Sequence, residues 1–267
     1  MIVCSELLDK SVLNMTTYEI DIIILSYAKN DALKQLTIEA INTLIDSEDP
    51  ENIHFNILVL ETNKELIPYQ YEYSNTVYPE EKFGFHRYLN IGIALTNSPF
   101  ICLCNNDLIF ERNWASEILK EMERDSLILS ASPYCPKFHA ESGFQKYRPP
   151  MLGYDSGILI GWCIFLKREI FEIIGSLDEH FEFWYCDRDY GKTLNYYNIK
   201  HCLISSSFVT HLSNKSLNTL DEEVKSKLTD FQHLYYDYKW NHKSRPLLAF
   251  NTLIFKIKVF ARHIFKR

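Results

Sequence analysis

The chain has 267 residues, 46% of them hydrophobic, enough for one large globular domain or for a domain with an appendage. Its net charge of −7 disfavours general nucleic-acid binding. The sequence contains no uncharged apolar run of about 18 residues, so no membrane-spanning segment is predicted.

The first predicted elements form a strand–helix–strand unit. Residues 19–27 are mostly apolar and predict a buried strand of the parallel type. Asn30 or Asp31 is the expected cap of a helix over residues 33–44, where apolar side chains recur at helical spacing. Residues 55–60 predict a second strand, so the unit is a βαβ crossover, expected to be right-handed.

The next strand ends in a polar tip. Residues 100–104 predict a short buried strand, and Asn105, Asn106 and Asp107 follow it directly. Polar residues at the carboxyl end of a buried strand lie where open α/β sheets bind ligands. Oxygen atoms of Asn105 and Asp107 are suited to a hard divalent cation. The structural alternative is an Asn/Asp turn leading into a second strand over residues 108–110.

The remaining elements alternate along the chain. Helices are expected after Gly84 and over residues 114–122, 168–174 and 190–197, and strands over residues 127–132, 157–166, 199–204 and 208–211. Residues 133–156 contain four of the nine prolines and predict a long active-site loop. Thr219 and Glu222 form a capping box before a further helix.

Seven cysteines are scattered through the chain, mostly in apolar runs. The odd number and irregular spacing predict reduced thiols in a cytoplasmic protein. Cys102 and Cys104 alternate on a strand and share one face, but no second pair completes a zinc site.

Four polar clusters follow apolar runs: Glu61, Asn105 with Asp107, Asp187 with Asp189, and His211. The segments that carry them, over roughly residues 20–212, resemble in order a family 2 glycosyltransferase of the GT-A fold. The matching segments are Asp21–Tyr27 and Leu58–Glu61 for the first two strands, the Gly84, Arg87, Asn90 and Gly92 pattern, Leu103–Asp107 for the DXD motif, Gly161–Arg168, Cys186–Asp189 and Val209–His211. The order of these individually weak motifs makes the match specific.

The resemblance implies an α/β fold with a Rossmann-type mixed sheet flanked by helices, and an inverting, metal-dependent glycosyltransferase. It implies a nucleotide-sugar donor, a glycan or lipid-linked acceptor and a divalent metal, Mn²⁺ or Mg²⁺. The metal ligands would be Asn105, Asp107 and His211. Asp187 would be the general base, with Asp189 as the second candidate. The donor-binding residues would be Ser26, Tyr27, Glu61, Arg87, Asn106 and Trp162.

Three positions depart from the family pattern. Cys186 replaces the usual glutamate, Asn105 replaces the first aspartate of the metal motif, and Glu61 replaces a more usual aspartate. The alternative function is therefore a non-catalytic sugar-nucleotide or glycan-binding protein that retains the fold.

Several side chains also have structural interpretations. Asp187 and Asp189 fit the start of the following helix as caps. His211 fits a structural residue at a strand end, and Arg87 fits a loop support. Trp162 and Trp184 fit either sugar stacking or burial. A P-loop ending at Thr193 is disfavoured because Cys186 occupies the position of its first glycine, and no dinucleotide-binding glycine pattern follows the first strand.

The expected organisation is a leader over residues 1–18, a catalytic domain over residues 19–215 and a helical extension over residues 216–267. Residues 246–267 carry five basic residues and no acidic one, which leaves −12 on the rest of the chain. On a helix from Phe250 the apolar residues share one face, and the basic residues share the other, interrupted only by Phe255 and Val259. This pattern favours peripheral contact with a membrane surface. The alternative is packing on the domain or on a second subunit in a homo-oligomer.

Overall fold

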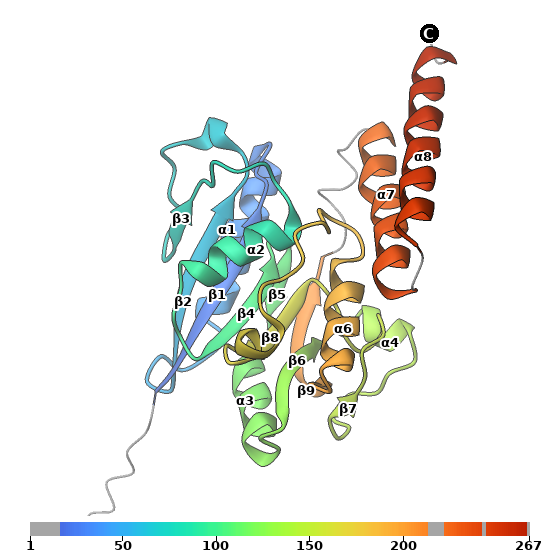
Figure 1. Ribbon diagram of the computed structural model, residues 1–267. Coiled ribbons are helices and arrows are strands. Elements are labelled where there is room, and N and C mark those ends of the chain that lie inside the picture. The colour runs from blue at the N-terminus through green and yellow to red at the C-terminus, as the bar shows by residue number, and fades with distance from the viewer. Residues whose placement is uncertain (1–16, 213–221, 242–243, 266–267) are drawn as a thin grey trace, which may run out of the picture.

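The computed structural model describes residues 17–212, 222–241 and 244–265 (Figure 1). The leader up to residue 16 and the predicted cap at Thr219 lie outside this part of the chain. The strands are β1 (Tyr18–Ser26), β2 (Ile53–Glu61), β3 (Asn75–Val77), β4 (Phe100–Asn105), β5 (Leu108–Phe110), β6 (Ile128–Tyr134), β7 (Met151–Leu152), β8 (Cys163–Lys167) and β9 (Lys200–His211).

The α-helices follow the sequence pattern closely in the first half of the chain. They are α1 (Asp31–Ile45), α2 (Phe85–Ala94), α3 (Trp114–Arg124), α4 (Phe138–Glu141), α5 (Ile170–Ile174), α6 (Cys186–Tyr196), α7 (Glu222–Trp240) and α8 (Arg245–Phe265). Asn30 is the cap of α1, because its side chain accepts a hydrogen bond from the backbone N–H of Leu33.

The strands form one mixed sheet in the order β3-β2-β1-β4-β8-β6-β9-β5, with β7 paired to β9. The first four strands in this order are parallel, whereas β8 is antiparallel to both β4 and β6. The carboxyl ends of β1, β2 and β4 therefore meet at one edge of the sheet. This edge is where the sequence predicts the ligand site.

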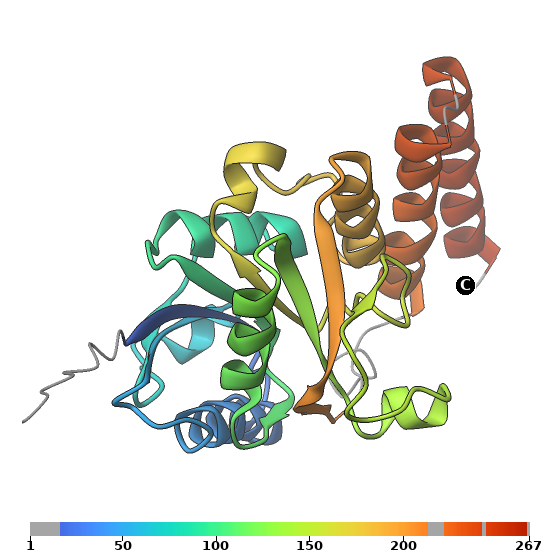
Figure 2. The ribbon, with the colours of Figure 1, turned by 90° about the horizontal axis from the view of Figure 1, so that it is seen from below.

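Helices cover both faces of the sheet, with α1 on one side and α2, α5 and α6 on the other (Figure 2). Alternate residues of β1 divide between two cores: Ile22 and Ile24 pack with side chains of α1 and α3, and Ile23 packs with side chains of α2, α5 and α6. A strand apolar on both faces is typical of a sheet buried by helices.

Three predicted strands differ from the structure. The strand predicted over residues 157–166 begins only at Cys163, because Ile158 and Leu159 both donate backbone hydrogen bonds to the carbonyl of Asp155 in a turn. The two strands predicted over residues 199–211 are one strand, β9. Its serines lie at a register shift, where the pairing with β6 passes from Ile204 to Phe208, and Ser205 is buried there and bonded to Arg148.

The last two helices lie side by side beyond α6 (Figures 1 and 2). Phe255 of α8 packs against Phe231 of α7, with ring centroids 6.4 Å apart. Within the described residues, no helix is both long enough and apolar enough to span a membrane.

Candidate active site

The first two strand ends are joined by a buried carboxylate. The parallel register places Ser26 beside Glu61. Glu61 has no exposed surface, and its carboxylate accepts hydrogen bonds from Ser26 Oγ and Tyr71 Oη and from the backbone N–H groups of Ala28 and Asn63. Four donors satisfy a buried carboxylate, so Glu61 fixes the two loops that leave β1 and β2.

Tyr71 reflects this environment. Burial, together with the neighbouring Glu61 carboxylate, raises the pKa of Tyr71 and keeps its hydroxyl protonated as a donor. Ser26 is likewise buried and bonded, whereas Tyr27 is partly exposed beside it. Of the predicted donor-binding residues in these two strands, Tyr27 is therefore the one whose side chain is open to a ligand.

The polar tip of β4 meets the end of β9. Because β5 pairs with β9, Leu108 lies opposite His211, and Asp107 Oδ1 lies 3.1 Å from His211 Nε2. The backbone carbonyl of Asp107 also accepts a hydrogen bond from Leu212. The structure thus brings two of the three predicted metal ligands together from distant parts of the sequence.

The donor set of this pair fits a divalent metal. A carboxylate oxygen and an imidazole nitrogen are both ligands for Mn²⁺, and carboxylates suit Mg²⁺. Within the described ranges no third His, Cys, Asp or Glu side chain joins them in one group. Two protein side chains would leave most coordination positions for phosphate oxygens and water.

Trp162 extends the site towards the predicted base. Its ring stacks on the His211 ring with centroids 5.3 Å apart and planes 9° apart, and its carbonyl accepts a hydrogen bond from Asn105. The preceding residue, Gly161, lies against Asp187: a Cβ atom at Gly161 would be only 2.8 Å from Asp187 Cβ. A side chain at residue 161 would therefore displace Asp187.

Asp187 lies in the first turn of α6 and is partly exposed. Its carboxylate accepts a hydrogen bond from the backbone N–H of Arg188, and no other side chain of the described residues bonds to it. A carboxylate at a helix N-terminus is stabilised by the helix dipole. Asp187 is thus partly exposed beside Gly161, with no side-chain partner among the described residues.

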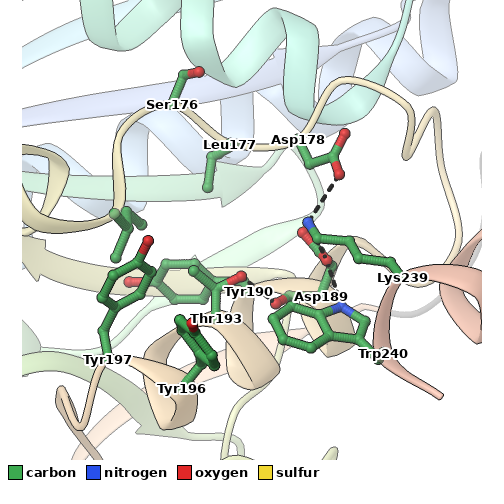
Figure 3. A pocket seen from close by; sticks show the side chains of 11 residues that line it. Ser176, Leu177, Asp178, Asp189, Tyr190, Thr193, Tyr196, Tyr197, Lys239 and Trp240 are labelled. Carbon is green, nitrogen blue, oxygen red and sulfur yellow. Dashed lines mark hydrogen bonds and ion pairs between the residues drawn. The ribbon is translucent and has the colours of Figure 1, made fainter. Parts of the chain in front are cut away.

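Asp189 has a different environment, although it is only two residues further on. It is 2% exposed, and its Oδ1 accepts a hydrogen bond from Trp240 Nε1 at 2.7 Å and an ion pair from Lys239 Nζ at 2.8 Å (Figure 3). Burial raises the pKa of Asp189 despite these two partners. Both contacts use Oδ1, so α7 holds this carboxylate at the border of a cavity.

Lys239 also binds Asp178, so one ammonium group joins the turn after α5 to the start of α6. Burial opposes ionisation of Asp178, but the hydrogen bonds from Lys239 and His180 outweigh it and lower its pKa to about 2. A cavity of about 250 Å³ lies on this side of α6, bordered by Tyr196 and Tyr197. Asp187 does not line it.

Cys186, the residue in place of the family's glutamate, is buried. Its thiol donates a hydrogen bond to the carbonyl of Phe181, and burial raises its pKa. It holds the loop before α6 and presents no acid to the site.

The other predicted donor-binding residues make contacts within the protein. Arg87 Nε lies 3.0 Å from Glu179, and Asn90 bonds to the backbone of Leu177 at both N–H and carbonyl. Arg87 and Asn90 therefore attach α2 to the segment that precedes α6. Asn106 is buried and donates to Thr37 of α1. Trp184 is 43% exposed.

Sequence reasoning missed the residues of α7 that hold this segment. Besides Lys239 and Trp240, Tyr235 donates to Asp178, and Gln232 accepts from the backbone of Glu182. These contacts join parts of the chain about 50 to 60 residues apart. The signal in the sequence was a lysine among aromatic residues at the end of the helix.

Comparison with known families gives one match. A family model described as glycosyl transferase family 2 matches residues 21–175, more than half of the chain. No protein of curated function matches the sequence.

Solved structures share the fold. GalNAc-T7 with UDP, GalNAc and Mn²⁺ aligns with a TM-score of 0.57 and 12% identity over 73% of this chain and 44% of that chain. S. aureus TarS 1–349 with UDP-GlcNAc aligns with a TM-score of 0.55 and 12% identity over 76% of this chain and 61% of that chain. The catalytic domain of Drosophila β1,4-galactosyltransferase 7 with xylobiose aligns with a TM-score of 0.51 and 12% identity over 77% of this chain and 75% of that chain. This chain thus spans less than two thirds of the first two structures, and the shared architecture confirms the predicted fold class.

Proposed function

The chain belongs to glycosyl transferase family 2, and from this premise we propose that it transfers a sugar from a nucleotide-sugar donor to a hydroxyl acceptor with inversion. The observation that carries the proposal is the continuous row of Asp107, His211, Trp162, Gly161 and Asp187. A metal-binding pair at one end of this row and a free carboxylate at the other match the two needs of the reaction. The leaving diphosphate needs charge neutralisation, and the acceptor must lose a proton.

Asp107 and His211 are the proposed ligands of a divalent metal, Mn²⁺ or Mg²⁺, with Asn105 contributing from the end of β4. When bound, the metal would neutralise the charge that develops on the diphosphate leaving group. Trp162 fixes the His211 ring by stacking, and the hydrogen bond from Asn105 to the Trp162 carbonyl fixes the end of β4. The ligands are therefore held by neighbours before the donor arrives.

Asp187 is the proposed general base. The acceptor oxygen attacks the anomeric carbon as the bond to the diphosphate oxygen breaks, and Asp187 takes the acceptor proton. Direct attack with one base inverts the anomeric centre. Asp189 is given no chemical role in this scheme, because Lys239 and Trp240 both hold its Oδ1 and tie it to α7.

The donor is proposed to be a uridine diphosphate sugar. This choice is supported by the UDP and UDP-GlcNAc bound in two structures that share the fold. Tyr27 and the loops that Glu61 fixes are proposed to form the nucleoside site at the ends of β1 and β2. Glu61 would act by shaping the loops, because its own oxygens already have four donors.

The acceptor is proposed to be a glycan or a lipid-linked glycan reached at a membrane surface. Support comes from α8, where Leu247, Phe250, Leu253 and Ile257 are 41%, 58%, 57% and 57% exposed. The helix packs on α7 through Phe255, so this apolar row stays uncovered by the described residues. Apolar residues beside a basic sequence suit a helix at the interface of an anionic membrane.

The proposal is tested by measuring thermal unfolding with a panel of nucleotide sugars, with and without Mn²⁺. A bound donor raises the unfolding temperature because it binds only the folded state. We expect UDP-sugars to stabilise the protein in the presence of Mn²⁺, and the stabilising donor to be slowly hydrolysed. Stabilisation without any hydrolysis or transfer would favour a binding protein instead.

A further inference from the structure

Three thiols lie together in the core, one residue away from the candidate active site. Cys102 and Cys104 alternate on β4 and share a face, and Cys163 of β8 is the cross-strand partner of Cys104. Cys102 Sγ lies 3.3 Å from Cys104 Sγ and 3.7 Å from Cys163 Sγ, and all three sulfurs lie within 4.8 Å of one another. The sheet thus adds a third sulfur to the pair that the sequence contains.

We propose that Cys102, Cys104 and Cys163 form a binding site for a soft, thiophilic metal ion, Cu(I). Three sulfurs held at about 2.3 Å from one ion in a plane stand about 4 Å apart, close to the spacing already present. Soft thiolate ligands select Cu(I) and zinc over the hard cations that carboxylates bind. The site is therefore distinct in chemistry from the Asp107–His211 pair.

The number of ligands favours copper over zinc. Structural zinc sites take four protein ligands, and among the described residues no fourth His, Cys, Asp or Glu joins this group. The thiols belong to an apolar core cluster with Trp114 and Phe165. Each thiol that binds the ion does so as a thiolate and releases its proton to solvent.

The position of the thiols gives the site a structural consequence. Cys104 directly precedes Asn105, Cys163 directly follows Trp162, and the Asn105 N–H donates to the Trp162 carbonyl at 3.0 Å. An ion held between β4 and β8 would therefore join the two strand ends that carry the candidate active site. The proposal rests on the thiols alone and stands whether or not the proposed function is correct.

The test is a competition for Cu(I) between the full-length protein and the coloured chelator bicinchoninate, under argon. The thiols are at most 2% exposed, so the protein is refolded from denaturant in the presence of the complex. We expect one equivalent of copper to be withdrawn. The affinity should fall at least tenfold in Cys163→Ala and in Cys102→Ala. It should stay unchanged in the matched controls Cys202→Ala, another buried thiol, and Cys4→Ala.

X-ray absorption at the copper edge of the wild-type protein provides a second measurement that does not depend on the variants folding. Three sulfur neighbours are expected. Failure to withdraw copper, equal withdrawal by Cys163→Ala and wild type, or nitrogen and oxygen neighbours would overturn the proposal. Tighter binding of Zn²⁺ than of Cu(I), lost in the same two variants, would overturn the assignment to copper.

Discussion

Asp107 Oδ1 and His211 Nε2 lie 3.1 Å apart, although one residue follows β4 and the other ends β9. Pairing of β5 with β9 creates this contact. Trp162 stacks on the His211 ring, and its neighbour Gly161 lies against Asp187. The sheet edge thereby brings the proposed metal ligands and the partly exposed Asp187 carboxylate into one row.

Asp187→Asn should lower turnover at least about a hundredfold, because the amide keeps the size of the side chain but cannot accept the acceptor proton. Binding of UDP with Mn²⁺ should be retained, since Asp187 contacts neither proposed metal ligand. Single-turnover transfer and calorimetric UDP binding measure the two quantities. Wild-type turnover in the variant would remove Asp187 as the base.

Asp189→Asn is the matched control, and it should lower stability while leaving turnover nearly unchanged. It weakens the contacts with Lys239 and Trp240, so the free energy of unfolding in urea should fall by roughly 1–3 kcal/mol. Turnover per folded molecule should remain within about threefold of wild type. A hundredfold loss of turnover with unchanged stability would instead assign the base to Asp189.

Acid should destabilise the protein from about pH 6.5 downwards. Burial lowers the pKa of His201 to about 3, so this histidine is neutral when folded and becomes protonated on unfolding at mildly acid pH. The pKa of His201 is lower in the folded state than in the unfolded state. Its contribution to the free energy of unfolding is therefore fully present above about pH 6.5 and is lost as the pH falls towards 3.

For each such buried histidine, the free energy of unfolding falls by up to about 1.4 kcal/mol per pH unit in this range. His201→Asn should flatten the fall in unfolding free energy between pH 6.5 and 4.5. Identical pH profiles for wild type and His201→Asn would contradict the assignment.

The exposed row on α8 should bind anionic membranes. Full-length protein should float with vesicles of phosphatidylglycerol and phosphatidylcholine at low salt, and less with phosphatidylcholine alone. Replacing Phe250, Leu253 and Ile257 by serine should abolish flotation without unfolding the protein, because all three side chains are exposed. Equal flotation of the two proteins would exclude this row as the contact, and a dimer lost in the triple variant would identify a second subunit as its partner.

Much of the fold was predictable because it depends on local patterns. The apolar run of β1 and the helical spacing in α1 are strong signals, and Asn30 is an ordinary cap. The turn before β8 was wrongly predicted as strand because Leu159 and Ile160 are apolar and buried there. An apolar run identifies burial more reliably than backbone conformation.

The candidate site was predictable as a set of strand ends, but the partners of its side chains were not. The pair of Asp187 and Asp189 looks equivalent in the sequence. Only the packing of α7 separates them, since Lys239 and Trp240 bind Asp189 and leave Asp187 free. The buried network around Glu61 also depends on Tyr71, which lies in an irregular segment without a pattern.

Asp107 and His211 are proposed to bind a divalent metal together with the diphosphate of the donor. Calorimetric titration of UDP into the protein, with Mn²⁺ and then with a chelator, measures this binding. We predict Mn²⁺-dependent binding that is lost in Asp107→Asn and weakened by a smaller factor in His211→Ala. UDP binding of equal affinity with and without Mn²⁺, unchanged in Asp107→Asn, would contradict metal binding by Asp107 and His211.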